Sequence, residues 1–232
     1  MQDLSSVSIV FDLDGTLVDS APDLAGAMNA VLRAHGRREV PAEKVRSMVG
    51  HGARALMARG FAETGAPADD ALLDRLYDEF LEYYLAHIAD ESVLFPGVRE
   101  VTEALRQKGA RLAVCTNKPE KAAIDLLDAL EFSAPFDALV GGDTLAVRKP
   151  DAEAFRETLR RMQAREGDRG VMVGDSETDV LTGRAAGVPV IGVTFGYTPQ
   201  PIATFSPDVI IDHFADFPQA LAAILRIEPA CR

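Results

Sequence analysis

Cysteine, positive charge and long apolar segments are all scarce in this sequence, and each shortage narrows what the protein can be. Cysteine occurs only twice in 232 residues, at Cys115 and Cys231. Cys115 lies inside an apolar run and Cys231 lies next to the C-terminus, so a disulfide between them has little support. We expect two free thiols, which are typical of a reducing compartment.

Positive charge is the second shortage, because 24 lysines and arginines face 36 aspartates and glutamates, for a formal net charge of -12. Nucleic acids and anionic membrane surfaces both favour clustered lysine and arginine, so we expect neither as a partner. An anionic substrate would be repelled at long range. A site for such a substrate therefore needs a metal ion or a lysine close to the bound anion.

Long apolar segments are the third shortage. No window approaches the ~20 apolar residues that a membrane-spanning helix requires. The first ten residues, MQDLSSVSIV, lack the basic stretch followed by a long apolar one that marks a signal peptide. We therefore expect a cytoplasmic protein, and its 47% hydrophobic content suffices for a sizeable core.

The sequence does contain short apolar runs, and patterns typical of amphipathic helices separate most of them. The runs cover 7–11, 111–115, 136–142, 170–175, 188–194 and 208–212. Uniformly apolar strands that alternate with helices indicate a parallel sheet covered on both faces. We predict an α/β fold with a doubly wound, mostly parallel sheet, in which ligands bind at the carboxyl ends of the strands.

One region breaks this alternation, because residues 18–88 show helical periodicity and no convincing strand. Pro41 within it suits the first turn of a helix. We therefore predict an all-helical cap domain that is inserted into a discontinuous core domain. The predicted bounds are 18–90 for the cap, and 1–17 with 91–232 for the core.

Four of the predicted strand ends carry polar residues that can do chemistry. The first leads into DLDGT, the second into TNK, the third into RKPD, and the fourth ends in GDSETD. These ends lie along one edge of a parallel sheet, so we expect their side chains to converge. The residues concerned are Asp12, Asp14, Thr116, Asn117, Lys118, Lys149, Asp175, Ser176 and Asp179.

Asp12 and Asp14 place two like charges at the end of a buried strand, where repulsion and desolvation both disfavour them. A divalent cation would offset this cost, and Mg²⁺ prefers hard oxygen ligands such as Asp12, Asp14 and Asp175. Asp12 could then attack phosphorus, while Asp14 could protonate the leaving oxygen and later deprotonate a water. Thr116 and Lys149 could bind the phosphoryl oxygens, so the pattern indicates phosphoryl transfer.

The order and spacing of DLDGTLVDS, CTNKP, RKPD and VGDSETD resemble the four motifs of the haloacid dehalogenase superfamily, and the DxDGT form resembles its phosphatases. The resemblance covers essentially the whole chain. It implies that Asp12 is the nucleophile and Asp14 the general acid and base, with Mg²⁺ held by the Asp12 side chain, the Asp14 backbone carbonyl and Asp175. The residues that it implies for binding the phosphoryl group are Thr116, Asn117 and Lys149. Thr16, Ser176 and Asp179 are expected to contact the catalytic and metal-binding residues without binding the substrate themselves.

A finer resemblance, carried by DLDGTLVDSAPDL, GHGARALM, LFPGV, TNKP, VGGD and TFGY, is to the phosphoglycolate phosphatase branch of that superfamily. The branch often has Gly-Asn-Gly in its cap where this sequence has Gly50-His51-Gly52, and we expect this loop to face the substrate. His51 contacts the substrate or is a solvated loop histidine. Arg54 pairs with a substrate carboxylate or lies on the surface. Lys118 reaches the phosphate or lies at a helix entrance.

The resemblance thus implies a magnesium-dependent phosphatase that hydrolyses a small phosphorylated metabolite, first of all 2-phosphoglycolate, through an aspartyl-phosphate. Pyrophosphate hydrolysis and a sugar-phosphate mutase remain as alternatives on the same core. A catalytically silent binding or regulatory protein is a third alternative, although such a protein is expected to have lost one of Asp12, Asp14, Lys149 and Asp175. The sequence leaves monomer and homodimer both open.

Overall fold

The computed structural model describes residues 3–226, and a six-stranded sheet with the order β5-β4-β1-β6-β7-β8 lies at its centre. Every neighbouring pair of these strands is parallel. The strands are β1 (Val7–Phe11), β4 (Arg111–Cys115), β5 (Ala138–Val140), β6 (Arg169–Gly174), β7 (Val190–Val193) and β8 (Val209–Ile211). The predicted α/β fold with a mostly parallel sheet is confirmed, while Cys231 lies outside the described residues.

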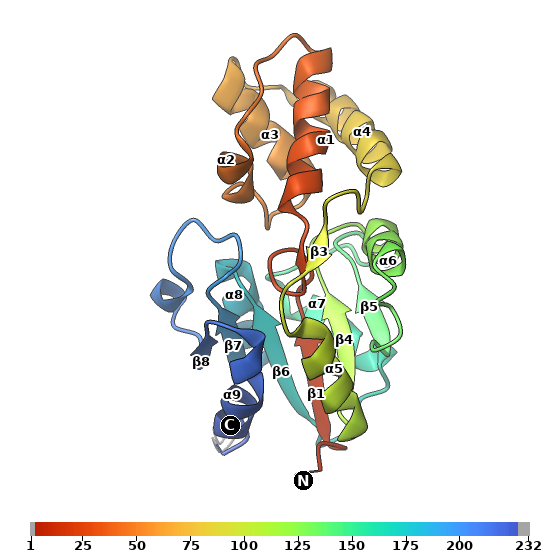
Figure 1. Cartoon of the computed structure of the whole chain (residues 1–232), viewed down its shortest axis with the longest axis vertical. Coiled ribbons are helices and arrows are strands. Elements are labelled where there is room, and N and C mark those ends of the chain that lie inside the picture. The colour runs from red at the N-terminus through yellow and green to blue at the C-terminus, as the bar shows by residue number, and fades with distance from the viewer. Residues whose placement is uncertain (1–2, 227–232) are drawn as a thin grey trace.

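Helices cover both faces of this sheet (Figure 1), and the two faces can be told apart along β1. Ile9 and Phe11 belong to an apolar cluster that includes residues of α5, α6 and α9. Val10 points to the other face, into a cluster that includes residues of α7 and α8. The helices are α5 (Val98–Gln107), α6 (Glu120–Ala129), α7 (Ala152–Arg161), α8 (Glu177–Ala186) and α9 (Phe217–Ile224).

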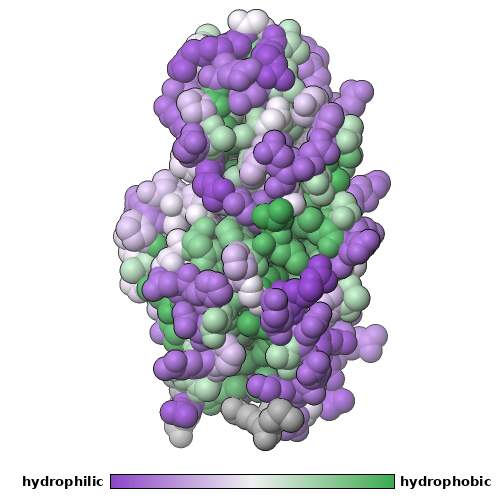
Figure 2. Space-filling model, viewed as in Figure 1, coloured by the Kyte–Doolittle hydropathy of each residue, from purple (hydrophilic) through white to green (hydrophobic). Residues whose placement is uncertain are grey.

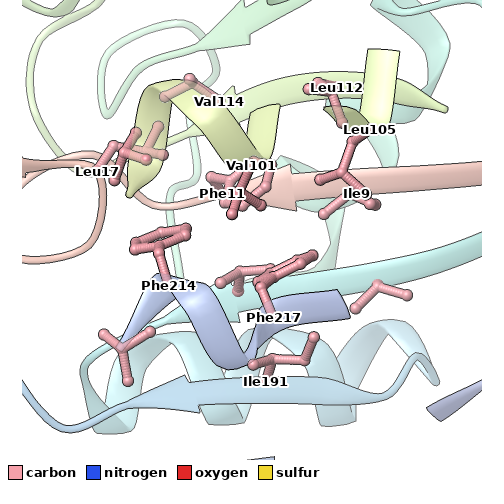
Figure 3. Close-up of a cluster of buried hydrophobic side chains, with 14 of the residues drawn as sticks. Ile9, Phe11, Leu17, Val101, Leu105, Leu112, Val114, Ile191, Phe214 and Phe217 are labelled. Carbon is pink, nitrogen blue, oxygen red and sulfur yellow. The ribbon is translucent and has the colours of Figure 1, made fainter. Parts of the chain in front are cut away.

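Aromatic side chains fill much of the first of these clusters (Figure 3). The rings of Phe11 and Phe217 lie 5.8 Å apart, and Phe214 stacks on Phe217 at 6.0 Å. Phe214 begins a short 3-10 helix, η2 (Phe214–Asp216), and a second one, η1 (Ile202–Phe205), follows β7. All five residues of β1 are buried. The residues that follow its carboxyl end therefore begin in a part of the protein that is shielded from bulk water.

Within the described residues, four further helices lie beyond the carboxyl ends of the core strands and form a layer that we call the cap (Figure 1). They pack around an apolar cluster of their own. Helices α1 and α3 approach closely at Gly60, where an added Cβ would lie 2.7 Å from the sulfur of Met28. The four helices are α1 (Ala21–Ala34), α2 (Ala42–Arg46), α3 (Ala53–Thr64) and α4 (Asp70–Ala86).

Two details of the helical region differ from the prediction. Val18–Asp19 forms β2, which pairs antiparallel with β3 (Val93–Leu94), so the expectation of no strand in residues 18–88 is wrong at its first two residues. This pairing joins the segment that leaves the core to the segment that returns to it. The sequence did not predict it because a strand of two residues is too short to show a periodic pattern. Pro41 is the N-cap of α2, with ψ of 142°, so it precedes the first helical turn instead of lying in it.

The surface on the side of the molecule seen in Figure 2 is hydrophilic over the top of the cap and along the edges, with hydrophobic residues gathered at mid-height, just below the cap, and down the centre of the core. Val93 of β3 is among the exposed hydrophobic residues, with 58% of its surface accessible. Across residues 3–226, no helix is both long and apolar enough to cross a membrane.

Asp23, in the first turn of α1, bonds to the segment through which the chain returns from the cap to the core. Its buried carboxylate accepts hydrogen bonds from the backbone N–H groups of Glu91 (3.0 Å) and Ser92 (2.8 Å) and from the Ser92 hydroxyl (2.6 Å). The two ends of the inserted helical segment are therefore held together at the base of the cap.

We expect Asp23→Ala to lower the free energy of unfolding by on the order of 3 kcal/mol, because buried N–H donors lose their acceptor. Urea denaturation measures this change. The matched control is Asp90→Ala, which removes an exposed carboxylate that pairs with His87 nearby in the chain and should cost less than about 0.5 kcal/mol. Equal effects of the two substitutions would contradict the assignment of Asp23.

Candidate active site

The loop after β1 places Asp12 at the end of the buried strand. The Asp12 N–H donates to the Val173 carbonyl of β6 (2.9 Å), and the Leu13 N–H donates to Oδ1 of Asp12 (2.7 Å). Gly15 follows with φ of +86°, and an added Cβ there would lie 2.6 Å from Oδ2 of Asp175. A glycine is therefore required for this loop to turn and to pass so close to Asp175.

Lys149 lies between two of the predicted acidic residues. Its buried ammonium is 3.0 Å from Oδ1 of Asp12 and 2.6 Å from Oδ1 of Asp179. The segment after β5 thus supplies a cation to one carboxylate at the end of β1 and to another in the first turn of α8. This is the convergence at one sheet edge that the sequence predicted.

Asp175, at the end of β6, is held by two neighbouring segments. Its Oδ1 accepts a hydrogen bond from the Thr16 hydroxyl (3.3 Å), and its Oδ2 accepts one from the Tyr197 N–H (2.7 Å). The loop that carries Tyr197 comes so close at Gly196 that an added Cβ would lie 2.2 Å from the Cβ of Asp175. Thr16 and the Gly196–Tyr197 loop therefore both hold the Asp175 carboxylate in place.

Burial raises the pKa values of Asp12 and Asp175. It raises the pKa of Asp12 to about 6, although the charge of Lys149 opposes the shift. Burial, and then the charges of Asp179 and Asp12, raise the pKa of Asp175 to about 8. Burial lowers the pKa of Lys149, but Asp12 and Asp179 outweigh this effect and leave it above its ordinary value, so the ammonium stays charged.

The acidic cluster has the composition of a site for a hard divalent cation. One carboxylate oxygen each from Asp12, Asp175 and Asp179 lies within 4.8 Å of the others. Asp179 is already engaged, because it pairs with Lys149 and accepts hydrogen bonds from the N–H (3.1 Å) and hydroxyl (2.6 Å) of Ser176 at the start of α8. Asp179 makes the shorter of the two ion pairs with Lys149, at 2.6 Å against 3.0 Å for Asp12, so Asp12 and Asp175 are the better candidates for ligands. Three carboxylates against one ammonium leave negative charge for a cation to offset.

The Asp14 side chain has different partners. It accepts hydrogen bonds from the Ser20 hydroxyl (2.5 Å) and from the Lys118 ammonium (3.1 and 3.2 Å to its two oxygens). Burial lowers the pKa of Lys118, but Asp14 and then Tyr84 outweigh this effect and leave that pKa above its ordinary value. Lys118 also lies over the ring of Tyr84 in α4, 4.4 Å from the centroid, so it connects Asp14 to the cap.

Thr116 and Asn117 follow β4 at the same edge. The Thr116 hydroxyl accepts a hydrogen bond from the Lys118 N–H (3.2 Å). The Asn117 amide donates to the carbonyls of Lys149 (3.1 Å) and Gly50 (3.4 Å). Asn117 therefore joins the lysine segment of the core to the first glycine of the cap loop.

A cavity of about 40 Å³ lies between the cap and the core, next to these residues. Asp12, Asp14 and Thr116 are among the residues that line its core side, and Gly50 and Gly52 of the predicted substrate loop are among those that line its cap side. The remaining cap lining is mainly apolar and comprises Leu24, Val49, Ala53, Leu56, Phe80, Leu81 and Tyr84. This space is small beside the ~300 Å³ or more of ordinary ligand pockets.

His51 and Arg54 lie outside that cavity. His51 lines a second one of about 100 Å³, together with Asp14, Asp175 and Tyr197. Burial and the charge of Arg59 lower the pKa of His51, which favours a neutral ring at pH 7.

Arg54 is turned to the cap surface. It pairs with Asp74 (3.0 Å) and Asp70 (2.9 Å) of α4, and all three side chains are exposed. Between the two alternatives left open for this residue, its partners favour the surface arginine.

Sequence reasoning gave no role to Tyr197 and did not find the partners of Lys118. The signal in the sequence for the contact of Tyr197 with Asp175 is Gly196 of TFGY, whose small size admits Asp175. Nothing in the sequence indicated that Lys118 would pair with Asp14, because the contact joins residues 104 positions apart.

Comparisons with known proteins cover nearly the whole chain. The family model for haloacid dehalogenase-like hydrolases matches residues 8–187. The phosphoglycolate phosphatase of Caulobacter vibrioides is 47% identical over 232 residues, which are 99% of this chain and 97% of that one. The phosphoglycolate phosphatase of Agrobacterium fabrum is 45% identical over 214 residues, 91% of each chain. A predicted phosphoglycolate phosphatase from Haemophilus somnus, solved by crystallography, is 33% identical with a TM-score of 0.84, over 93% of this chain and 98% of that one.

The raised pKa of Asp175 predicts a pH dependence of stability in a buffer containing EDTA. The folded form binds more protons than the unfolded form, so this stabilisation is present below the ordinary carboxyl pKa and is lost as the pH rises through about 8. Asp175→Asn should remove this loss. We expect its melting temperature to exceed that of the wild type at about pH 8.5, and by a smaller margin at about pH 5, because the loss builds up across this whole range. Asp125→Asn, on the surface of α6, is the control. An Asp175→Asn variant that is no more stable at the higher pH would contradict the assignment.

Proposed function

The chain belongs to the haloacid dehalogenase-like hydrolases and is a phosphatase of that family, and we propose that its substrate is 2-phosphoglycolate and its cofactor Mg²⁺. The similarity to phosphoglycolate phosphatases supports the choice of substrate, and the position of Asp12 is the observation that carries the proposed chemistry. It lies at the carboxyl end of the central strand, with Lys149 at 3.0 Å and the Asp175 carboxylate in the same buried cluster.

Asp12 is the nucleophile in this proposal. The Leu13 N–H and the Lys149 ammonium both hold Oδ1, so we assign the attack on phosphorus to Oδ2. Attack forms the aspartyl-phosphate and breaks the bond from phosphorus to the substrate's ester oxygen. Lys149 stabilises the negative charge that develops on the phosphoryl oxygens, and Thr116 and Asn117 border the same space.

Asp14 is the proton carrier. It gives its proton to the departing glycolate oxygen, and its carboxylate then takes a proton from the water that attacks the aspartyl-phosphate. Phosphate leaves and Asp12 is regenerated. The contacts with Ser20 and Lys118 hold Asp14 beside the cavity, where a leaving group and then a water would lie.

Mg²⁺ fits the residues that are present. We assign it to Asp12, Asp175 and the backbone carbonyl of Asp14, while Asp179 and Ser176 support Lys149 and the start of α8. Bound there, Mg²⁺ would offset the negative charge that otherwise repels a phosphoryl group.

The cap, assigned to residues 18–90, would open to admit the substrate and close over it, on the core formed by 1–17 and 91–232. The small cavity supports such a movement, because about 40 Å³ leaves little room for a phosphorylated acid. The apolar cap lining would keep bulk water from the aspartyl-phosphate. We place the protein in the cytoplasm, where the buried Cys115 thiol would stay reduced.

Asp12→Asn should abolish magnesium-dependent phosphate release, with a loss in kcat of more than about 10³-fold, because an amide oxygen is a poor nucleophile. The measurement is phosphate release from 2-phosphoglycolate. Circular dichroism and the melting temperature show whether the variant folds. Asp125→Asn is the matched control and should keep wild-type activity. A folded Asp12→Asn variant with undiminished release would exclude the proposed nucleophile.

Substrate identity is tested by phosphate release from 2-phosphoglycolate, a hexose phosphate and pyrophosphate, each with and without Mg²⁺. We expect the highest kcat/KM for 2-phosphoglycolate and no release without Mg²⁺. A preference for the hexose phosphate or pyrophosphate would overturn the proposed substrate and leave the proposed chemistry of Asp12 in place.

A further inference from the structure

The cavity between cap and core contains buried polar atoms that lack a hydrogen bond of good geometry. Within the described part of the chain, no hydrogen bond of good geometry reaches Oδ1 of Asn117 or the Tyr84 hydroxyl, which interacts only with the neighbouring Lys118 ammonium, and both residues line this cavity. Tyr84 is only 1% exposed, so bulk water does not reach its hydroxyl to form hydrogen bonds with it. Buried polar groups are normally satisfied, which indicates that a bound molecule completes this site.

Lys118 lies in the same place and carries a charge. Among the described residues that line the cavity it is the only basic one, and its side chain is 4% exposed. Its ammonium bonds to Asp14 and lies against the Tyr84 ring. An ammonium has three N–H donors, so it can bind a further acceptor beside Asp14.

The rest of the cavity does not suit a second anionic group. Its cap side is built largely from apolar residues such as Leu56 and Phe80, and its core side presents the carboxylates of Asp12 and Asp14. A substrate anion away from the phosphoryl group would be desolvated or repelled everywhere except near Lys118 and Tyr84. Oδ1 of Asn117 is itself an acceptor, so it takes no part in binding an anion.

We propose that Lys118 of the core and Tyr84 of the cap together bind the carboxylate of the substrate, and so select short phosphorylated acids over neutral phosphate esters. The inference rests on the proposed function, and it identifies the residues that bind the carboxylate of the substrate. Because the two residues come from the two layers, a bound carboxylate also ties the cap to the core.

A different role for Lys118 makes a different prediction. If Lys118 served only to hold Asp14, its loss would slow the hydrolysis of every phosphate ester by the same factor. Carboxylate binding instead changes the ratio between an acid substrate and its neutral counterpart. That ratio is therefore the quantity to measure.

The test compares kcat/KM for 2-phosphoglycolate with kcat/KM for ethyl phosphate, which has a methyl group in place of the carboxylate. We expect the wild type to prefer 2-phosphoglycolate. Tyr84→Phe should reduce this preference by about tenfold and Lys118→Met by about a hundredfold, since each removes a donor to a buried charge. The controls are Tyr83→Phe, whose ring stacks on His87 in the cap, and Lys121→Met, whose side chain is 78% exposed. Both should keep the wild-type preference.

The outcomes separate this inference from the function on which it rests. No magnesium-dependent hydrolysis of 2-phosphoglycolate by the wild type would overturn both. Hydrolysis without preference over ethyl phosphate, or a preference that Tyr84→Phe and Lys118→Met retain, would overturn the carboxylate site and leave the phosphatase assignment standing. Should Lys118→Met not fold, Tyr84→Phe decides alone, because it removes one hydroxyl that makes no hydrogen bond of good geometry in the described residues.

Discussion

The ion pairs of one buried lysine hold the site together. Lys149 bonds to Asp12 from the end of the first strand and to Asp179 from the start of α8, and Asp175 completes the acidic group. Without an ammonium among them, these carboxylates could not be buried together in their charged form. One lysine does not neutralise all three aspartates, so the cluster keeps a net negative charge. A divalent cation would offset this remaining charge.

The junction of cap and core is the second constraint, and it reaches the same cluster. Arg46 of α2 bonds to Asp19 (2.7 Å), and the Tyr197 hydroxyl donates to the same carboxylate (2.8 Å). The Tyr197 N–H in turn donates to Asp175. One residue therefore contacts both the segment from which the cap starts and a carboxylate of the acidic cluster, so the position of the cap and the shape of the site are physically linked.

The core and its acidic edge could be predicted because their signals are local. Apolar runs mark the strands, and Asp12 and Asp175 each stand directly after one. What could not be predicted depends on contacts between distant segments. The pairing of Lys118 with Asp14 and the approach of Tyr197 to Asp175 are set by how the cap and a late loop pack. Arg54 shows the same limit, since only the position of α4 reveals its two aspartate partners.

A crystal structure of the protein grown with Mg²⁺ and inorganic phosphate tests the central claim most directly. We predict one ion at about 2.0–2.1 Å from a carboxylate oxygen of both Asp12 and Asp175, with Asp179 still paired to Lys149 and the phosphate beside Asp12. An ion bound elsewhere, or density for no ion at saturating Mg²⁺, would contradict it.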